Sequence, residues 1–315
     1  MIVLDSIQPV IRNAKHVTVD DAAIARWVQQ TPRENLLAHP GGLHEHFPGN
    51  DNQIANLVLL ISAMNFCFWS DNPIRIQWRG QTYERFNAML VSILLSAKSD
   101  ARWFDAAYWA EVTPQELKFV LAGSGELLLM EERLRVVRET AAVLLDRFDG
   151  QFSNAVESVN HRAWSLAVLL MTNFDSFRDV AGYRGSPVFF MKRAQICAMD
   201  LAQAWAARGG PMVAGLEELT AFADYRVPQI LRHFGILRVS DSLAAKIDAG
   251  MELAAGCDEE VELRAASIEA VDRMSRQTGK AGRPVSPWVI DCQLWERSHG
   301  ADVTIPHHRT RTIYY

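Results

Sequence analysis

Apolar residues recur at three- and four-residue steps along most of the chain, which is the spacing of one buried face of an α-helix. This period predicts helices over residues 20–30, 52–69, 84–97, 130–148, 161–172, 188–207, 241–255 and 257–276. Capping residues predict two more helix starts, at Thr113-Pro114 and at Ser286-Pro287. The pattern therefore predicts an all-α, mostly helical protein.

Strand signals are few. Residues 74–78 alternate between apolar and polar types and lead through Gly80 into residues 81–83, which predicts one small β-hairpin. The last residues, 309–315, are rich in β-branched and aromatic types and should be extended. No internal repeat or long linker interrupts the chain. We therefore expect one domain over residues 1–315, with two lobes (1–150 and 151–315) and a ligand cleft between them.

Composition narrows the class of protein. The chain has 315 residues, of which 49% are apolar and 22% charged, so it is an ordinary globular sequence rather than a disordered or fibrous one. Its net charge is −5 and it has no continuous stripe of Lys and Arg. Because binding to a nucleic-acid backbone needs clustered cations, nucleic acid is not expected to be the main partner.

The sequence shows no sign of a metal or a membrane. The four cysteines lie far apart without a CxxC pair, so a zinc knot is not expected. The most apolar segment, residues 55–69, is shorter than the roughly 20 residues that cross a membrane. The N-terminus lacks the features of a signal peptide. These observations predict a cytoplasmic protein, and the absence of an apolar heptad makes a monomer the default expectation.

Asp224 is the most unusual candidate for chemistry. Residues 215–223 read as a helix, Pro228 should open the next helix, and Gly235 should end it. Asp224 would then lie at or just past a helix C-terminus, where the helix dipole disfavours an anion. Two interpretations remain open: a turn residue paired with Arg226, or a catalytic carboxylate at a junction between helices.

A second acidic candidate lies on the late helix that Pro287 opens. Asp291 is bracketed by apolar residues and shares a helix face with Trp295. A buried acid needs a partner, so Asp291 either caps a neighbouring helix, pairs with an arginine, or contacts a ligand. Glu296 is the next residue after Trp295 and could equally be a solvated surface residue.

Aromatic and basic residues supply further candidates. Phe66 and Phe68 end a strongly apolar run and are either core residues or a wall on which a flat heterocycle stacks. His46 lies in a loop without further ligands at metal spacing, so a hydrogen-bonding role is favoured over zinc binding.

Lys192, next to Arg193, and the pair Arg309 and Arg311 could hold a phosphate or could lie on the surface. Arg309 and Arg311 alternate, so on an extended segment they point to the same side. The sequence contains no GxGxxG, P-loop, HExxH or GxSxG pattern. The sequence therefore does not indicate a common nucleotide-binding fold, a zincin or a serine hydrolase.

Several spaced motifs together resemble one known family. The motifs lie at residues 65–69, 189–195, 222–229, 262–265, 290–295 and 308–315, in the order in which that family has them. The whole set, which runs from about residue 20 to the C-terminus, resembles the queuosine salvage proteins, the queuosine 5′-phosphate N-glycosylases. Motifs in a fixed order are more specific than any single motif.

The resemblance implies hydrolysis of the N-glycosidic bond of queuosine 5′-monophosphate, with release of the base queuine for salvage into tRNA. It implies an all-helical fold similar to that of helix–hairpin–helix DNA glycosylases, and no metal or other cofactor. Carried over by position, Asp224 is the catalytic carboxylate. The base-pocket residues would be His46, Phe222, Asp291, Cys292 and Glu296.

Three positions depart from the pattern of the family. Met191 stands where an aromatic residue is expected, Ser62 where an acid is usual, and Cys292 where a tyrosine is common. These departures concern the detail of the pocket and the choice of substrate more than the reaction.

The implied reaction is consistent with the residues. Glycosidic cleavage passes through an oxocarbenium-like state, which a fixed carboxylate such as Asp224 can stabilise or trap covalently. Queuine is a 7-deazaguanine, so protonation at N7 cannot assist its departure as a leaving group. Its cationic aminomethyl arm and diol suit Asp291 and Glu296.

Two alternatives remain open. One is a binding protein that retains queuine or a related deazapurine without cleaving a bond. The other is a glycosylase acting on polymeric DNA or RNA, for which the charge of −5 is unfavourable.

Overall fold

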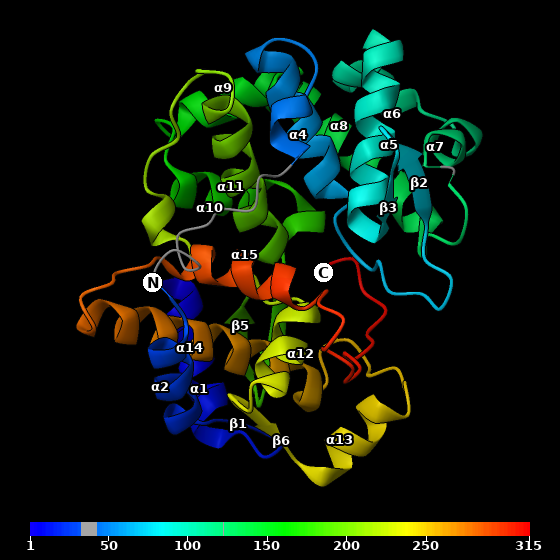
Figure 1. The fold of residues 1–315 in the computed structure, drawn as a ribbon. Coiled ribbons are helices and arrows are strands. Elements are labelled where there is room, and N and C mark those ends of the chain that lie inside the picture. The colour runs from blue at the N-terminus through cyan, green and yellow to red at the C-terminus, as the bar shows by residue number, and fades with distance from the viewer. Residues whose placement is uncertain (33–42, 122) are drawn as a thin grey trace.

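A computed structural model describes residues 1–32, 43–121 and 123–315 of the protein. As the sequence predicts, this part of the chain is mostly helical and includes the small hairpin of β2 (Arg75–Trp78) and β3 (Gln81–Glu84) (Figure 1). Two further antiparallel pairs were not predicted. β1 (Val17–Val19) pairs with β6 (Leu237–Val239), and β4 (Val180–Tyr183) pairs with β5 (Ser186–Phe189).

The helices of the first half of the chain are α1 (Ile2–Asn13), α2 (Asp21–Gln30), α4 (Asp51–Ala63), α5 (Arg85–Ser99), α6 (Ala106–Glu111), α7 (Pro114–Val120) and α8 (Met130–Phe148). Those of the second half are α9 (Phe152–Ser158), α10 (Ala163–Asn173), α11 (Lys192–Ala206), α12 (Arg226–His233), α13 (Asp241–Asp248), α14 (Asp258–Lys280) and α15 (Pro287–Arg297). Short 3₁₀ turns at Leu43–His46, Ala101–Phe104, Asp175–Phe177 and Leu216–Glu218 join some of them.

Local sequence explains where several helices begin. The side chain of Thr113 accepts a hydrogen bond from the backbone of Glu116, whose carboxylate accepts one in return, so α7 has the predicted capping box. Asn50 and Gln53 form the same reciprocal pair at the start of α4. Pro287 occupies the first turn of α15, also as predicted.

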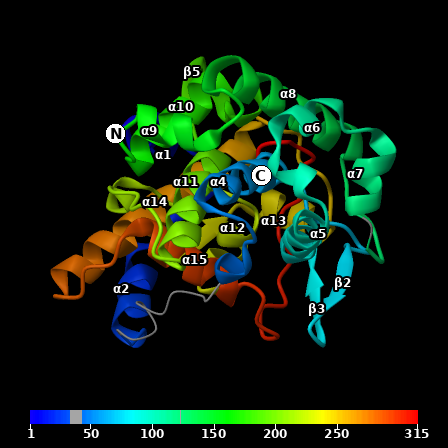
Figure 2. The same cartoon turned by 90° about the horizontal axis from the view of Figure 1, so that it is seen from above.

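Two long-range packings organise the molecule. The apolar helix α4 packs against α11, and the two lie side by side near the middle of the view in Figure 2. The long helix α14 packs against α1, α2, α12 and α15, so the beginning and the end of the chain meet in the lower part of Figure 1. Residues distant in sequence thereby come together around α11, α12 and α15.

The predicted helix over residues 52–69 is wrong at its end. The helix α4 stops at Ala63, and residues 64–69 are irregular although they are buried. The apolar run continues past the helix because these residues enter the core, so hydrophobicity alone could not mark the boundary.

The predicted helix over residues 215–223 is also wrong. Only a 3₁₀ turn at Leu216–Glu218 forms, and the chain then runs without regular structure into α12, which begins at Arg226. The backbone N–H of Thr220 is bonded by the side chain of Gln195 instead of a helical carbonyl. Asp224 therefore lies just before a helix N-terminus, not after a C-terminus.

Two other predicted helices are shorter than expected. The segment 188–207 begins as strand β5, and its helix starts only at Lys192. The segment 241–255 ends as a helix at Asp248, because Gly250 adopts a positive φ of 68°. The C-terminal residues 309–315 are non-helical as expected, with an isolated bridge between Arg309 and Glu252.

Candidate active site

A cavity of about 640 Å³ lies where α5, α11, α12 and α15 approach one another. This volume is in the range of sites for small organic ligands. Its wall combines aromatic, acidic and basic side chains from segments far apart in the sequence. Among them are Phe68, Arg85, Lys192, Phe222, Asp224, Arg226, Asp291, Cys292, Trp295, Glu296, His299 and Tyr315.

Asp224 is fixed by the first turn of α12. One carboxylate oxygen, Oδ1, accepts hydrogen bonds from the backbone N–H groups of Arg226 at 2.8 Å and Val227 at 2.9 Å. Because the N-terminus of a helix favours an anion, the dipole stabilises this carboxylate rather than opposing it. The predicted electrostatic conflict at Asp224 is therefore wrong, although its place at a junction before a helix is observed.

The charge of Asp224 is balanced between burial and its neighbours. Burial raises the pKa of Asp224, whereas Lys192 and the two backbone N–H groups act to lower it. The side chain is buried but still lines the cavity. Its second oxygen, Oδ2, accepts none of the hydrogen bonds found in the described part of the chain. That oxygen is therefore available to a ligand.

Lys192 is the cationic counterpart of Asp224 in this wall. It begins α11, and its Nζ lies 3.4 Å from the backbone oxygen of Asn65 and 3.5 Å from the Oδ1 of that residue. Burial lowers the pKa of Lys192 to about 8, although Asp224 acts in the opposite direction. Lys192 thus contacts the segment after α4 and interacts electrostatically with the segment before α12.

Asp291 has a backbone partner rather than an arginine. Its Oδ1 accepts the N–H of Phe222 at 2.9 Å, which joins α15 to the irregular segment before α12. Burial raises the pKa of Asp291 well above its ordinary value, and the nearby charge of Asp224 raises it further. Asp291 and Trp295 both line the cavity, as their shared helix face predicts.

The structure brings seven of the residues selected from the sequence to the cavity wall. These are Phe68, Lys192, Phe222, Asp224, Asp291, Cys292 and Glu296. They come from four parts of the chain that no local pattern connects.

Four other selected residues lie elsewhere. Phe66 is fully buried beside the guanidinium groups of Arg133 and Arg193, with ring-to-Cζ distances of 4.4 and 5.2 Å, so it is a core residue. The side chain of His46 packs edge-on against Trp78, outside the residues that line the cavity. The neighbouring His44 lines the cavity instead, with its Nε2 at 3.2 Å from Asp200.

Arg309 and Arg311 are also outside the cavity wall. They approach Trp69 and pair with Asp71 and Glu252, respectively, at 2.7 and 2.9 Å. Each guanidinium thus has a carboxylate partner at the surface. The expectation that either one reaches the same site as Lys192 is not supported by this placement.

Two arginines in the wall were missed by the sequence analysis as anion-binding candidates. Arg85 begins α5 with a positive φ of 55°, and its Nε is buried without a hydrogen-bond partner among the described residues. Arg226 begins α12 and donates to Gln229 at 3.0 Å. Burial, with added repulsion from Arg226 and Arg85, lowers the pKa of the adjacent His299 to about 4. Nη1 of Arg85 donates to Glu84 at 3.0 Å, and Glu84 also lines the cavity, so this end carries two guanidinium groups and one carboxylate.

Arg226 stands in the motif around Asp224, so its position in the sequence could have indicated a site residue. The sequence analysis treated it only as a partner of Asp224. Arg85 carried no signal, because nothing local indicates that the turn after β3 faces the cavity. In the described part of the chain, no three His, Cys, Asp or Glu side chains are grouped to hold a metal ion. No described helix is both long enough and apolar enough to span a membrane.

Comparison with known proteins relates this cavity to one family. Residues 44–315 match the family described as queuosine salvage protein. A protein of Sphaerobacter thermophilus named queuosine 5′-phosphate N-glycosylase/hydrolase is 37% identical, with 99% of this chain and 97% of the relative aligned. Relatives of the same name from Bos taurus and Mus musculus are 30% and 31% identical, covering 99% and 92% of this chain and 98% and 97% of their own lengths. The chain therefore belongs to the queuosine salvage protein family.

Proposed function

We propose that this protein hydrolyses the N-glycosidic bond of queuosine 5′-monophosphate and releases queuine. The observation that carries the proposal is Asp224, a buried carboxylate with one oxygen fixed by a helix start and the other available in a cavity of about 640 Å³. The curated relatives that match nearly the whole chain bear the name of this activity. A carrier that only retains queuine has no comparable support.

In the proposed reaction, the carboxylate of Asp224 faces the positive charge that develops on the sugar as the base departs. A fixed anion in a site of low polarity stabilises such a state more than the ground state. Water then adds to the anomeric carbon, either directly or after capture of the sugar by Asp224. The products are queuine and ribose 5-phosphate.

The wall beside Asp224 supplies recognition of the base in this proposal. Phe222 and Phe68 offer aromatic faces to the deazapurine. Asp291 and Glu296 offer acceptors for its cationic arm and diol, and Cys292 lies between them along α15. Burial raises the pKa of Asp291, so this carboxyl group can carry a proton when no cation lies beside it.

The 5′-phosphate is assigned to the cationic end of the cavity, at Arg85 and Arg226, with Lys192 nearer the scissile bond. The buried Nε of Arg85, which has no partner among the described residues, is a donor suited to a phosphate oxygen. This proposal replaces Arg309 and Arg311, which do not line the cavity.

The reaction is tested by incubating the purified protein with queuosine 5′-phosphate and analysing the products by mass spectrometry. We expect queuine from the wild type and a roughly 10³-fold slower release from Asp224→Asn, because the amide keeps the acceptor but loses the charge. Asp105→Asn is the matched control, since Asp105 also accepts a backbone N–H two residues later, from Ala107 at the start of α6. Full activity of Asp224→Asn would refute the mechanism.

The phosphate assignment has its own test. Arg85→Met should raise KM for queuosine 5′-phosphate by about 10- to 100-fold and leave KM for the unphosphorylated nucleoside unchanged. Arg79→Met is the control, because Arg79 lies in the turn of the hairpin that precedes α5, over Trp78, and does not line the cavity. An equal effect on both substrates would contradict a phosphate contact.

The organisation of the molecule completes the proposal. We propose a single domain over residues 1–315 that acts as a cytoplasmic monomer on a free nucleotide, without nucleic acid as a direct partner. We also propose the helical arrangement of helix–hairpin–helix glycosylases, supported by the mostly helical fold and by a buried aspartate just before a helix start. Structural superposition and solution mass measurements test these points.

A further inference from the structure

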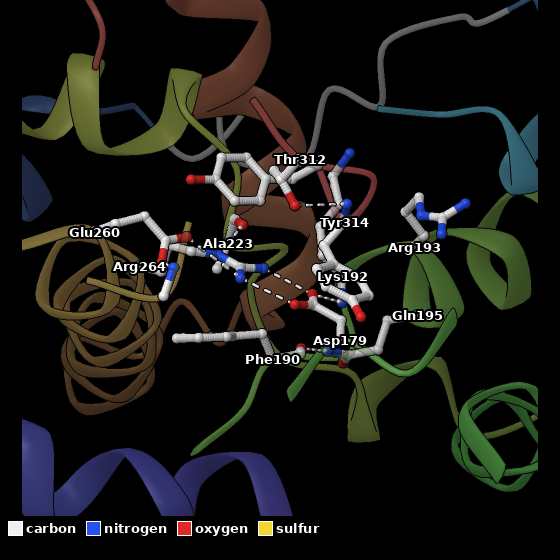
Figure 3. A network of polar contacts seen from close by, with 12 residues as sticks. Asp179, Phe190, Lys192, Arg193, Gln195, Ala223, Glu260, Arg264, Thr312 and Tyr314 are labelled. Carbon is white, nitrogen blue, oxygen red and sulfur yellow. Dashed lines mark hydrogen bonds and ion pairs between the residues drawn. The ribbon is translucent and has the colours of Figure 1, made fainter. Parts of the chain in front are cut away.

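One motif of the chain, residues 262–265, is not used by the proposed mechanism. Its two charged residues lie on α14 and serve different regions. Glu262 accepts backbone N–H groups of Lys15 and His16 and the hydroxyl of Tyr183, so it holds the N-terminal segment. Arg264 turns towards α11 and the segment before Asp224, and it is buried (Figure 3).

Every nitrogen of the Arg264 guanidinium has a partner. Its Nη1 and Nη2 donate to the two oxygens of Asp179 at 2.9 and 2.7 Å, and its Nε donates to the backbone oxygen of Ala223 at 3.0 Å. Glu260 lies 3.6 Å from Nη1. Figure 3 shows the bonds to Asp179 and Ala223 leaving Arg264 in different directions.

Both partners lead directly to the active site. Ala223 immediately precedes Asp224, so the bond to its carbonyl fixes the backbone that carries the carboxylate. Asp179 accepts the backbone N–H of Lys192 at 3.1 Å while it binds Arg264 (Figure 3). One guanidinium therefore connects the two residues of opposite charge in the cavity wall without itself lining the cavity.

The plane of the guanidinium is fixed from both sides. The Cζ of Arg264 lies 3.9 Å from the ring centre of Phe190 and 4.3 Å from that of Tyr315. A lysine would keep the charge but could not donate in three fixed directions or stack as a plane. The contacts thus require the shape of arginine and not only its charge.

We propose that Arg264 is a positioning residue, which together with Asp179 sets the placement of Asp224 relative to Lys192. This inference rests on the proposed function for its kinetic consequence. Its structural part does not depend on that function. The ion pair of Arg264 and Asp179 fixes the distance between the backbone of residue 223 and the start of α11. A misplacement of about 1 Å caused by a change distant from the reacting atoms can slow a reaction about 100-fold.

The test is Arg264→Lys, measured well below its own unfolding temperature. We expect kcat for queuosine 5′-phosphate to fall about 10- to 100-fold and KM to change by less than about threefold, because Arg264 lies outside the cavity wall. Arg273→Lys is the matched control on the same helix, where Arg273 pairs with Glu269 and Asp21 away from the cavity. Lower stability with unchanged kcat would show a purely structural role and overturn the proposal.

A second variant, Asp179→Asn, covers the case in which Arg264→Lys does not fold. The amide still accepts the N–H of Lys192 but loses the charge that pairs with Arg264, so the same selective loss of kcat is expected. If neither variant folds, the pair is required by the fold itself and the proposal is wrong.

A crystal structure separates this inference from the proposed function. In the folded variant, the carboxylate of Asp224 should be displaced relative to Lys192 by about 1 Å, a shift large enough to impair a reaction. That displacement is measurable even if the wild type does not hydrolyse queuosine 5′-phosphate, an outcome that would refute the activity alone. An unchanged distance in the variant would refute the positioning role.

Discussion

Two irregular segments of the cavity region, residues 64–69 and 220–225, are each held from behind by a buried arginine. Arg133 of α8 donates to the backbone oxygens of Met64 and Phe66, and Arg264 of α14 donates to that of Ala223. The difference lies in charge balance. Arg264 has a carboxylate partner in Asp179, whereas Arg133 has hydrogen-bond acceptors that are carbonyls and the sulfur of Met89.

The pKa values follow from this difference. Burial lowers the pKa of Arg133 to about 9. Burial also acts to lower the pKa of Arg264, but Asp179 and Glu260 outweigh it and the pKa is raised. Arg133 therefore depends on carbonyls just beyond the end of α4, where the helix dipole is negative. Arg133 thus completes a helix end, whereas Arg264 connects charged residues of the site.

The largest expected effect separates these two roles. Arg133→Ala should lower the free energy of unfolding by about 4 kcal/mol, because several buried carbonyls lose their donor. The unfolding temperature should fall by about 10 °C in calorimetry. Arg138→Ala, on the same helix but bonded to the single carbonyl of Val112, should cost about 1 kcal/mol. Equal losses would remove the distinction drawn for Arg133.

The next effect concerns Tyr315, which contacts both segments. Its ring centre lies 6.4 Å from that of Tyr225, its carbonyl accepts the N–H of Cys67 at 2.8 Å, and its hydroxyl lies 3.4 Å from His308. Burial lowers the pKa of His308 from 6.5 to about 3. The folded protein therefore keeps this imidazole neutral while the unfolded chain takes up a proton below pH 6.5.

As a result, His308 should lower the free energy of unfolding by about 1.4 kcal/mol for each unit by which the pH falls from 6.5 to 4. His308→Gln should flatten that slope in urea titrations at several pH values. A slope that is identical in the wild type and in His308→Gln would contradict the role of His308.

A smaller effect tests Lys192, which contacts one segment through Asn65 and interacts electrostatically with the other through Asp224. With a pKa of about 8, Lys192 is charged below that pH and loses its proton above it. We expect kcat/KM to fall about tenfold per unit as pH rises above 8. Lys192→Arg should move this limb to higher pH, and a limb that stays near 8 must belong to another group.

The smallest expected effect compares two rings of one segment. Phe68→Leu should raise KM by about three- to tenfold, because Phe68 lines the cavity. Phe66→Leu should instead lower the unfolding temperature and leave KM unchanged, because Phe66 is enclosed by Arg133 and Arg193. The opposite result would place Phe66 against the substrate, as the sequence alone allows.

The sequence predicted the helical class and most helix starts, because periodicity and capping are local properties. It could not predict where residues 64–69 leave the helix, since the donors that hold them come from Arg133, which is distant in sequence. The same limit applies to residues 220–225, which depend on Gln195 and Arg264. The errors at these two segments therefore occurred where tertiary contacts replace local hydrogen bonds.

The candidate site was predicted in part. Asp224, Asp291 and Lys192, which were selected from the sequence, line one cavity in the structure, but the dipole acting on Asp224 has the opposite sign from that expected. Arg309 and Arg311 form a shared pattern in sequence, yet their charges are satisfied at the surface. The spacing of charged residues cannot show whether a carboxylate from another segment already pairs with them.

The hydrogen bond between Cys67 and Tyr315 has a consequence for how the protein reaches its folded state. Helices form locally and early, but this bond requires two distant parts of the chain to meet, which is a slow step. On dilution from denaturant, circular dichroism should therefore recover before the proposed cleavage of queuosine 5′-phosphate does.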